Sequence, residues 1–157
     1  METEQFADPE VATFWHFIAS SLDRLVALAL ALDETGLAWR PPGPETNSVH
    51  ALTIHTLGNA EENILQTLCG TLVGRERDAE FAQAGAAAGV RARWETLRPH
   101  LAAALAAVTP GELDRARPHP RRGTLSGRAV LIVVARHAAE HLGQAELTRD
   151  LWRASRA

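Results

Sequence analysis

Two histidines near the C-terminal end of the chain have the spacing of metal ligands. His137 and His141 lie four residues apart in a segment of helical periodicity, so their imidazoles project from one helix face. Val134, Ala138 and Ala145 share that face, which predicts that both rings point toward the protein interior. Two neutral imidazoles placed in this way can bind one divalent metal ion.

His55 is the third candidate ligand, because it lies between the apolar residues Leu52 and Leu57 in another helical segment. A buried imidazole without a polar partner is costly, and a shared metal ion would remove that cost for all three histidines. Three protein ligands leave at least one coordination position open, as in catalytic zinc sites. Gln144 follows His141 by three residues and is expected to line the same cavity.

Two acidic residues on the helix of His55 are candidates for orienting an imidazole through a hydrogen bond. Glu62 follows His55 by seven residues and therefore lies on the same side of the helix, and Glu61 is its neighbour. The alternative for both carboxylates is a position on the solvated helix surface.

The other histidines and the single cysteine are expected to have packing or surface roles. Cys69 lies about 21 Å from His55 along a helix, at ~1.5 Å per residue, and cannot share a metal ion with it. Residues 137–141 also match the H-x-x-E-H pattern of inverted zinc peptidases, with Glu140 as general base. Those enzymes need a third metal ligand well downstream in the sequence and a β-sheet that binds the substrate. Here only sixteen residues follow His141, and no sheet is predicted. The histidines without a site role are His16, His50, His100 and His119.

Apolar residues recurring every three or four positions predict four helices that carry these side chains. Asp8 is the expected cap of the first helix and Thr124 that of the last, and Pro99 is expected to kink or break the third. The four expected helices span residues 8–34, 47 or 48 to 70 or 74, 90–108 and 125–154.

No segment outside these helices has the alternating pattern of a strand, so we expect an all-α fold. The expected architecture is a four-helix bundle that forms one domain over residues 1–157. The connections between the helices, among them a stretch at 74–89 and an arginine-rich loop at 115–123, are about a dozen residues or longer. Connections of that length predict at least one crossover rather than simple up-and-down order.

Composition and charge argue against several classes of protein. Sixteen basic residues, all of them arginine, against nineteen acidic residues give a net charge of −3, which argues against nucleic acid as a partner. No apolar run is long enough to cross a membrane, and the N-terminal METEQFADPE lacks the pattern of a signal peptide. We therefore expect a cytoplasmic globular protein that does not bind membranes.

The sequence resembles the DinB-like (YfiT-like) superfamily of metal-binding helical bundles. The resemblance covers the chain in helix order and includes the pair Glu80-Phe81 after the second helix. It implies a divalent metal ion, zinc or nickel before others, bound by His55, His137 and His141. The patterns that carry it are Asn47-Ser48, Leu52-Thr-Ile-His55-Thr-Leu-Gly-Asn-Ala-Glu61 and Arg136-His137-Ala-Ala-Glu-His141-Leu-Gly143-Gln144.

Described members of this superfamily include transferases and isomerases that use bacillithiol, mycothiol or glutathione. The resemblance implies a metal site more directly than it implies a reaction. The activity that it suggests is a metal-dependent thiol S-transferase, in which the metal holds the thiol as a thiolate that attacks an electrophilic substrate. The arginines of the 115–123 loop either meet an anionic cofactor or are solvated: Arg115, Arg117, Arg121 and Arg122.

A non-catalytic protein is the alternative. It would be a metal-binding or stress-related bundle that acts as a homodimer, with Trp15, Trp39 or Trp152 at the interface unless they belong to the core. The coordination of the metal distinguishes the two interpretations. A fourth protein ligand would close a structural site, whereas an open position facing a cleft would favour catalysis.

Overall fold

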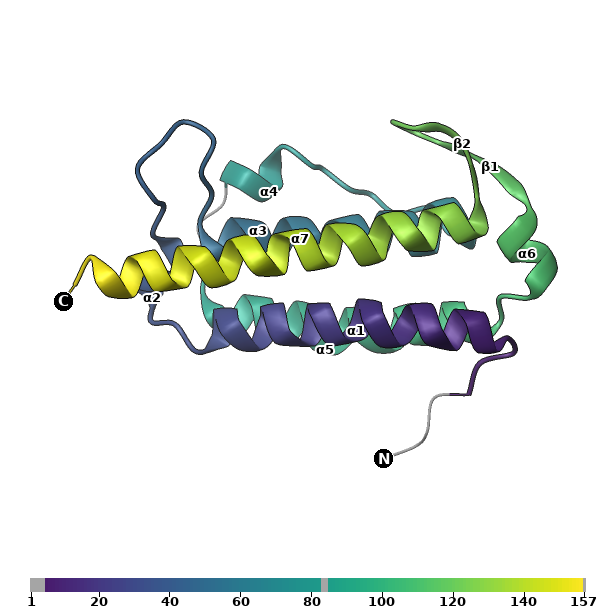
Figure 1. The fold of residues 1–157 in the computed structure, drawn as a ribbon, viewed down its shortest axis with the longest axis horizontal. Coiled ribbons are helices and arrows are strands. Elements are labelled where there is room, and N and C mark those ends of the chain that lie inside the picture. The colour runs from purple at the N-terminus through teal and green to yellow at the C-terminus, as the bar shows by residue number, and fades with distance from the viewer. Residues whose placement is uncertain (1–4, 83–84, 157) are drawn as a thin grey trace.

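A computed structural model describes residues 5–82 and 85–156 and shows a helical bundle (Figure 1). Residues 1–4, which begin the segment predicted to lack a signal-peptide pattern, lie outside the described residues. Four long helices form the bundle: α1 (Pro9–Leu30), α3 (Val49–Glu61), α5 (Ala87–Ala106) and α7 (Gly127–Ala154). The shorter elements are α2 (Glu34–Ala38), a π-helix η1 (Glu62–Leu68), α4 (Ala79–Ala82), α6 (Pro110–Asp114), β1 (Ala116–His119) and β2 (Gly123–Ser126). The predicted all-α bundle is confirmed.

The four long helices form two layers, with α3 beside α7 in one layer and α1 beside α5 in the other (Figure 1). The colour sequence in the figure shows that α1 and α7 run in one direction and α3 and α5 in the opposite one. The chain after η1 therefore returns along the bundle before α5 begins, and α4 lies on this returning segment. This segment is a crossover connection of the predicted kind, and it passes over α3.

The core lies between the two layers and is built from the apolar faces of the long helices. Leu22, Leu57, Leu101 and Leu131, one from each helix, are fully buried. Trp15 is also buried and belongs to the core, whereas Trp39 and Trp152 are half-buried and pack against each other with ring centroids 5.7 Å apart. No helix in the described part of the chain is long and apolar enough to span a membrane.

Side-chain caps fix where the long helices begin. The Asp8 carboxylate accepts a hydrogen bond from the Glu10 backbone N–H at 2.7 Å, which confirms the predicted start of α1. Ser48 caps α3 in the same way. The predicted cap of the last helix was wrong: Thr124 is part of β2, and because the chain stays extended to the end of that strand, Ser126 caps α7.

Two other helix predictions needed correction. The first helix ends at Leu30 instead of Glu34, because Asp33 starts the short helix α2 by accepting a hydrogen bond from the Gly36 N–H at 2.7 Å. The third helix continues through Pro99, so the break, one of the two effects expected of this proline, does not occur. Its apolar residues on both sides of the proline, Leu97 and Leu101, are buried in the same core and hold the two halves together.

The helix that carries His55 changes from α to π geometry at Glu62. In η1 the Cys69 N–H donates to the Ile64 carbonyl, five residues earlier, at 3.0 Å. Gly70 follows with a φ of 76°, a left-handed conformation that ends the helix. Short π segments of this kind occur frequently at functional sites.

The arginine-rich loop contains a hairpin, so the prediction that no strand forms was wrong. β1 pairs with β2 in antiparallel register, from Ala116 opposite Ser126 to His119 opposite Gly123. Each strand is only four residues long and includes neither an apolar alternation nor a β-branched run, which is why the sequence pattern did not reveal it. The turn of the hairpin, residues 120–122, carries Arg121 and Arg122.

Candidate metal centre

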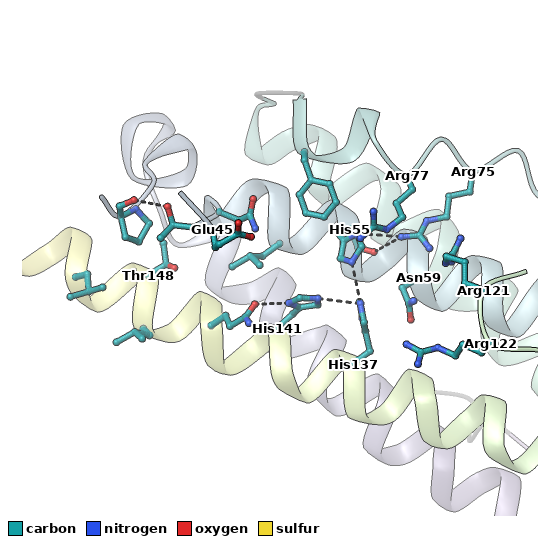
Figure 2. A pocket seen from close by; sticks show the side chains of 18 residues that line it. Glu45, His55, Asn59, Arg75, Arg77, Arg121, Arg122, His137, His141 and Thr148 are labelled. Atoms are coloured by element: carbon teal, nitrogen blue, oxygen red, sulfur yellow. Dashed lines mark hydrogen bonds between the residues drawn. The ribbon is translucent and has the colours of Figure 1, made fainter. Parts of the chain in front are cut away.

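The three predicted ligands converge at one point between α3 and α7 (Figure 2). The Nε2 atom of His137 lies 3.1 Å from Nε2 of His55 and 3.1 Å from Nε2 of His141. One ring nitrogen from each of the three residues lies within 4.8 Å of the other two. This is a spacing at which three imidazoles can share one metal ion.

The ring of His55 is fixed by a buried carboxylate. Its Nδ1–H donates a hydrogen bond to Glu80 at 2.9 Å, and both side chains are almost fully buried. Arg75 in turn holds Glu80 with two hydrogen bonds, of 2.7 and 2.8 Å. Burial alone would raise the pKa of Glu80, but the hydrogen bonds from Arg75 and His55 outweigh it and lower the pKa below its ordinary value. Glu80 is therefore ionised when it orients the imidazole.

The ring of His141 is fixed by Gln144, which lines the cavity as expected. The Nδ1–H of His141 donates to the side-chain oxygen of Gln144 at 2.7 Å. Because His55 and His141 carry their protons on Nδ1, both present an unprotonated Nε2 to the shared point. The third ring, His137, has a buried Nδ1 with no hydrogen-bond partner among the described residues. The Nε2 lone pairs of His55 and His141 thus point toward the ring of His137. This set of nitrogen donors fits a divalent metal ion.

Burial keeps two of these histidines in the neutral form that binds metal. It lowers the pKa of His137 to about 2, together with the charges of His141, His55, Arg75 and Arg122. Burial also lowers the pKa of His141, more than Gln144 and Glu140 raise it. Neutral imidazoles do not have to lose a proton before they coordinate a metal ion at neutral pH.

The cluster opens into a cavity of about 750 Å³. Within residues 5–82 and 85–156, no fourth histidine, cysteine or carboxylate lies close enough to complete the group. On one side the cavity continues along α7 past Gln144 to Leu147 and Leu151. A metal ion held by the three histidines would have an open coordination position facing this cavity, which is the arrangement of catalytic sites.

The two carboxylates predicted to orient an imidazole have other partners. Glu62 accepts hydrogen bonds from Arg75, at 2.9 Å, and from Arg121. Glu61 pairs with Arg93 of α5 at 3.2 Å. The expectation that either of them contacts an imidazole directly was wrong, because arginines from the connecting segments satisfy Glu62 and an arginine of α5 satisfies Glu61.

The residues that do orient His55 come from the crossover segment, which we had predicted as a loop. Arg75 and Glu80 reach α3 at Gly58, where a Cβ atom would lie 2.2 Å from a Glu80 carboxylate oxygen. Gly58 thus leaves the space that the buried ion pair occupies. A signal for this role was present: Glu80 is followed by Phe81, an aromatic residue in an otherwise polar and small-residue stretch, and Phe81 packs on His55 with ring centroids 4.6 Å apart.

Comparison with known proteins shows the family of the chain. A family model described as the DinB superfamily matches residues 18–145, which is more than half of the chain and includes all three histidines. No sequence match was found among curated proteins.

Proposed function

The chain belongs to the DinB superfamily, and we propose that it is a metal-dependent thiol S-transferase. In this proposal His55, His137 and His141 bind a divalent metal ion, and the cavity beside them receives a low-molecular-weight thiol and an electrophilic substrate. Thiol transferases are among the described members of the superfamily. Zinc or nickel is the proposed metal, because both suit an imidazole donor set.

One observation supports this proposal above the others: three imidazole nitrogens converge on a point that faces an open cavity. A purely structural site is usually closed by a fourth protein ligand, and none is present among the described residues. The open side leaves room for an exogenous ligand such as a thiol.

The residues around the cluster have defined roles in this proposal. A divalent metal ion, when bound, lowers the pKa of a thiol so that it is a thiolate at neutral pH. Glu80 and Gln144 fix the rings of His55 and His141, so that the donor atoms are in place before a ligand arrives. In the transfer, the sulfur forms a bond to an electrophilic carbon, the leaving group departs with its bonding electrons, and the thiol proton passes to solvent.

Elemental analysis of the untagged protein tests the metal site. We expect about one equivalent of divalent metal per chain, and loss of most of it in His55→Ala, His137→Ala and His141→Ala. The exposed residue His100 supplies the control, since His100→Ala removes an imidazole outside the cluster. Equal metal contents in the wild type and all three cluster variants would rule out the site.

A transfer assay tests the reaction separately. The metal-loaded protein would be mixed with a chlorodinitrobenzene as electrophile and, in turn, with bacillithiol, mycothiol and glutathione. We expect turnover with at least one thiol and its loss in the His137→Ala variant. A protein that is fully loaded with metal but inactive with all three thiols would favour the non-catalytic metal-binding bundle instead.

A further inference from the structure

The cavity beside the histidines has a cationic end. Figure 2 shows four arginines grouped on the side of His55 and His137, whereas Glu45 and Thr148 lie toward the opposite side. All of these residues line the same cavity. Glu45 is the one carboxylate among its described lining residues. The four arginines are Arg75, Arg77, Arg121 and Arg122.

Two of these arginines are neutralised by buried carboxylates. Arg75 pairs with both Glu62 and Glu80, and Arg121 pairs with Glu62. Two positive and two negative charges therefore balance within this network. Its role is structural, since it joins the crossover segment and the hairpin turn to the helix of His55.

Arg122 and Arg77 are not balanced in this way. The side chain of Arg122 makes no hydrogen bond or ion pair with another described residue. Arg77 has only a solvent-exposed contact of 3.8 Å with Asp78, and its guanidinium lies over the ring of Phe81. The excess positive charge of these two arginines lies in the same cavity as the histidine cluster.

The turn that carries Arg122 is held in place. His119 accepts a hydrogen bond from the Arg121 backbone N–H at 3.1 Å and binds the buried Asn63 at 2.9 Å. The neighbouring Arg121 side chain is anchored to Glu62. Arg115 and Arg117, the other arginines of the predicted loop, pair instead with Glu112 outside this cavity. The fold thus directs two of the four loop arginines to the cavity.

Asn59 provides an independent sign of a polar ligand at the same end. Its side chain is more than nine-tenths buried and lines the cavity close to the arginines (Figure 2). The oxygen of its side-chain amide has no hydrogen-bond partner among the described residues. A buried amide whose hydrogen bonds are not made within the protein is costly unless a ligand or water completes them.

We propose that this end of the cavity is an anion subsite, in which Arg122 and Arg77 bind a carboxylate or phosphate group of the ligand whose reactive end faces the histidines. The side-chain oxygen of Asn59, which is an acceptor, would bind a hydrogen-bond donor of the ligand beside that anion. Guanidinium groups are well suited to such oxyanions because they offer several N–H donors in one plane. The inference rests on the proposed function for the position of the reactive end, but the subsite itself does not require the reaction.

The test compares two thiols of equal length, 3-mercaptopropionate and its uncharged amide, on protein loaded with Co²⁺. Thiolate-to-cobalt charge-transfer absorption reports binding of either thiol at the metal. We expect the carboxylate form to bind about ten- to a hundredfold more tightly, as a hydrogen-bonded charge pair predicts. The variant Arg77→Gln/Arg122→Gln should lose this preference, whereas Arg115→Gln, which removes one positive charge outside the cavity, should keep it.

The outcomes separate the two proposals. Equal affinities for the acid and the amide in the wild type would overturn the subsite and leave the thiol proposal standing. If neither thiol gives the absorption band, the thiol proposal fails, and calorimetric titration of the metal-free protein with glutarate and with inorganic phosphate decides on the subsite. If the wild type binds glutarate or phosphate and the double arginine variant does not, the subsite is supported, and the anion that binds shows which oxyanion it prefers. If the wild type binds neither anion, the subsite proposal is overturned.

Discussion

The Nδ1 atom of His55 lies 2.9 Å from a carboxylate oxygen of Glu80, a residue 25 positions later that reaches it from the crossover segment. This contact makes the crossover segment part of the site. It sets the tautomer of His55, leaves Nε2 free to coordinate, and ties the ring to Arg75 through the same carboxylate. The long connection between η1 and α5 therefore positions a metal ligand as well as joining two helices.

Glu80→Gln tests this arrangement. Glutamine keeps an oxygen that can accept the His55 hydrogen bond, but it removes the charge that polarises the ring and leaves Arg75 with one carboxylate fewer. We expect the affinity for zinc to fall roughly 10- to 100-fold, the usual effect of losing such a partner. Competition with a chromophoric chelator measures this affinity. Glu61→Gln, which changes a carboxylate paired with Arg93 outside the site, is the control; equal losses in both variants would contradict the assigned role of Glu80.

Gly58→Ala tests the space in which Glu80 lies. A Cβ atom there would meet a Glu80 oxygen at 2.2 Å, so the flexible end of that side chain has to move away. We expect weaker zinc binding in a protein that remains folded, because alanine also favours the helix by up to about 1 kcal/mol. Circular dichroism and zinc competition together measure the two effects.

Gly143→Ala is the matched control for that substitution. Gly143 lies on α7, and an added Cβ there has open space around it. It should therefore stabilise the helix by a similar amount without weakening zinc binding. If the two variants bind zinc equally well, the tight contact at Gly58 does not control the position of Glu80.

The helical ligands could be predicted from the sequence because their geometry is local. His137 and His141 share a helix face by spacing alone, and the apolar neighbours of His55 indicated that it faces inward. Arg75 and Glu80 could not be predicted in this way. Their position depends on where a long connection crosses α3, and neither spacing nor periodicity in residues 69–86 encodes that path. The partners of Glu62 could not be predicted for the same reason, because they come from two different loop segments.

The hairpin was missed for a related reason. Its strands contain proline, arginine and histidine and bury few apolar side chains, so the pattern of a strand is absent. What holds it is a set of specific polar contacts to the helix of His55, among them the bond between His119 and Asn63. Such contacts link residues 56 positions apart and become visible only in the folded chain.

Removal of the metal should lower the stability of the protein. A ligand that binds only the folded state adds about 2.7 kcal/mol at a hundredfold excess over its Kd, which for a chain of this size corresponds to roughly 5–10 °C in Tm. We expect zinc to raise the Tm of chelator-treated wild type by an amount of this order. His137→Ala should show no such increase, while His100→Ala should behave as the wild type. A Tm that zinc leaves unchanged in the wild type would argue against a site formed in the folded state.

We expect His119 to make the protein less stable at mildly acidic pH. Its Nε2–H donates to Asn63 and its Nδ1 accepts from the Arg121 N–H, so the neutral ring is fully bonded and a proton on Nδ1 would break the second bond. Burial lowers the pKa of His119, and the charges of Arg121 and Arg122 lower it further. The unfolded chain, with an ordinary histidine pKa of about 6.5, therefore takes up a proton before the folded chain does.

The free energy of unfolding should consequently decrease as the pH falls below about 6.5, by at most about 1.4 kcal/mol per pH unit from this residue. In His119→Gln that contribution is absent. Urea unfolding of metal-free wild type and variant measures the difference, which we expect to be largest near pH 8 and to shrink toward pH 5. The exposed His100 serves as control, because His100→Gln should leave the pH dependence unchanged. A stability difference between His119→Gln and the wild type that stays constant over this range would mean that the bonded ring accepts a proton as readily in the folded chain as in the unfolded one.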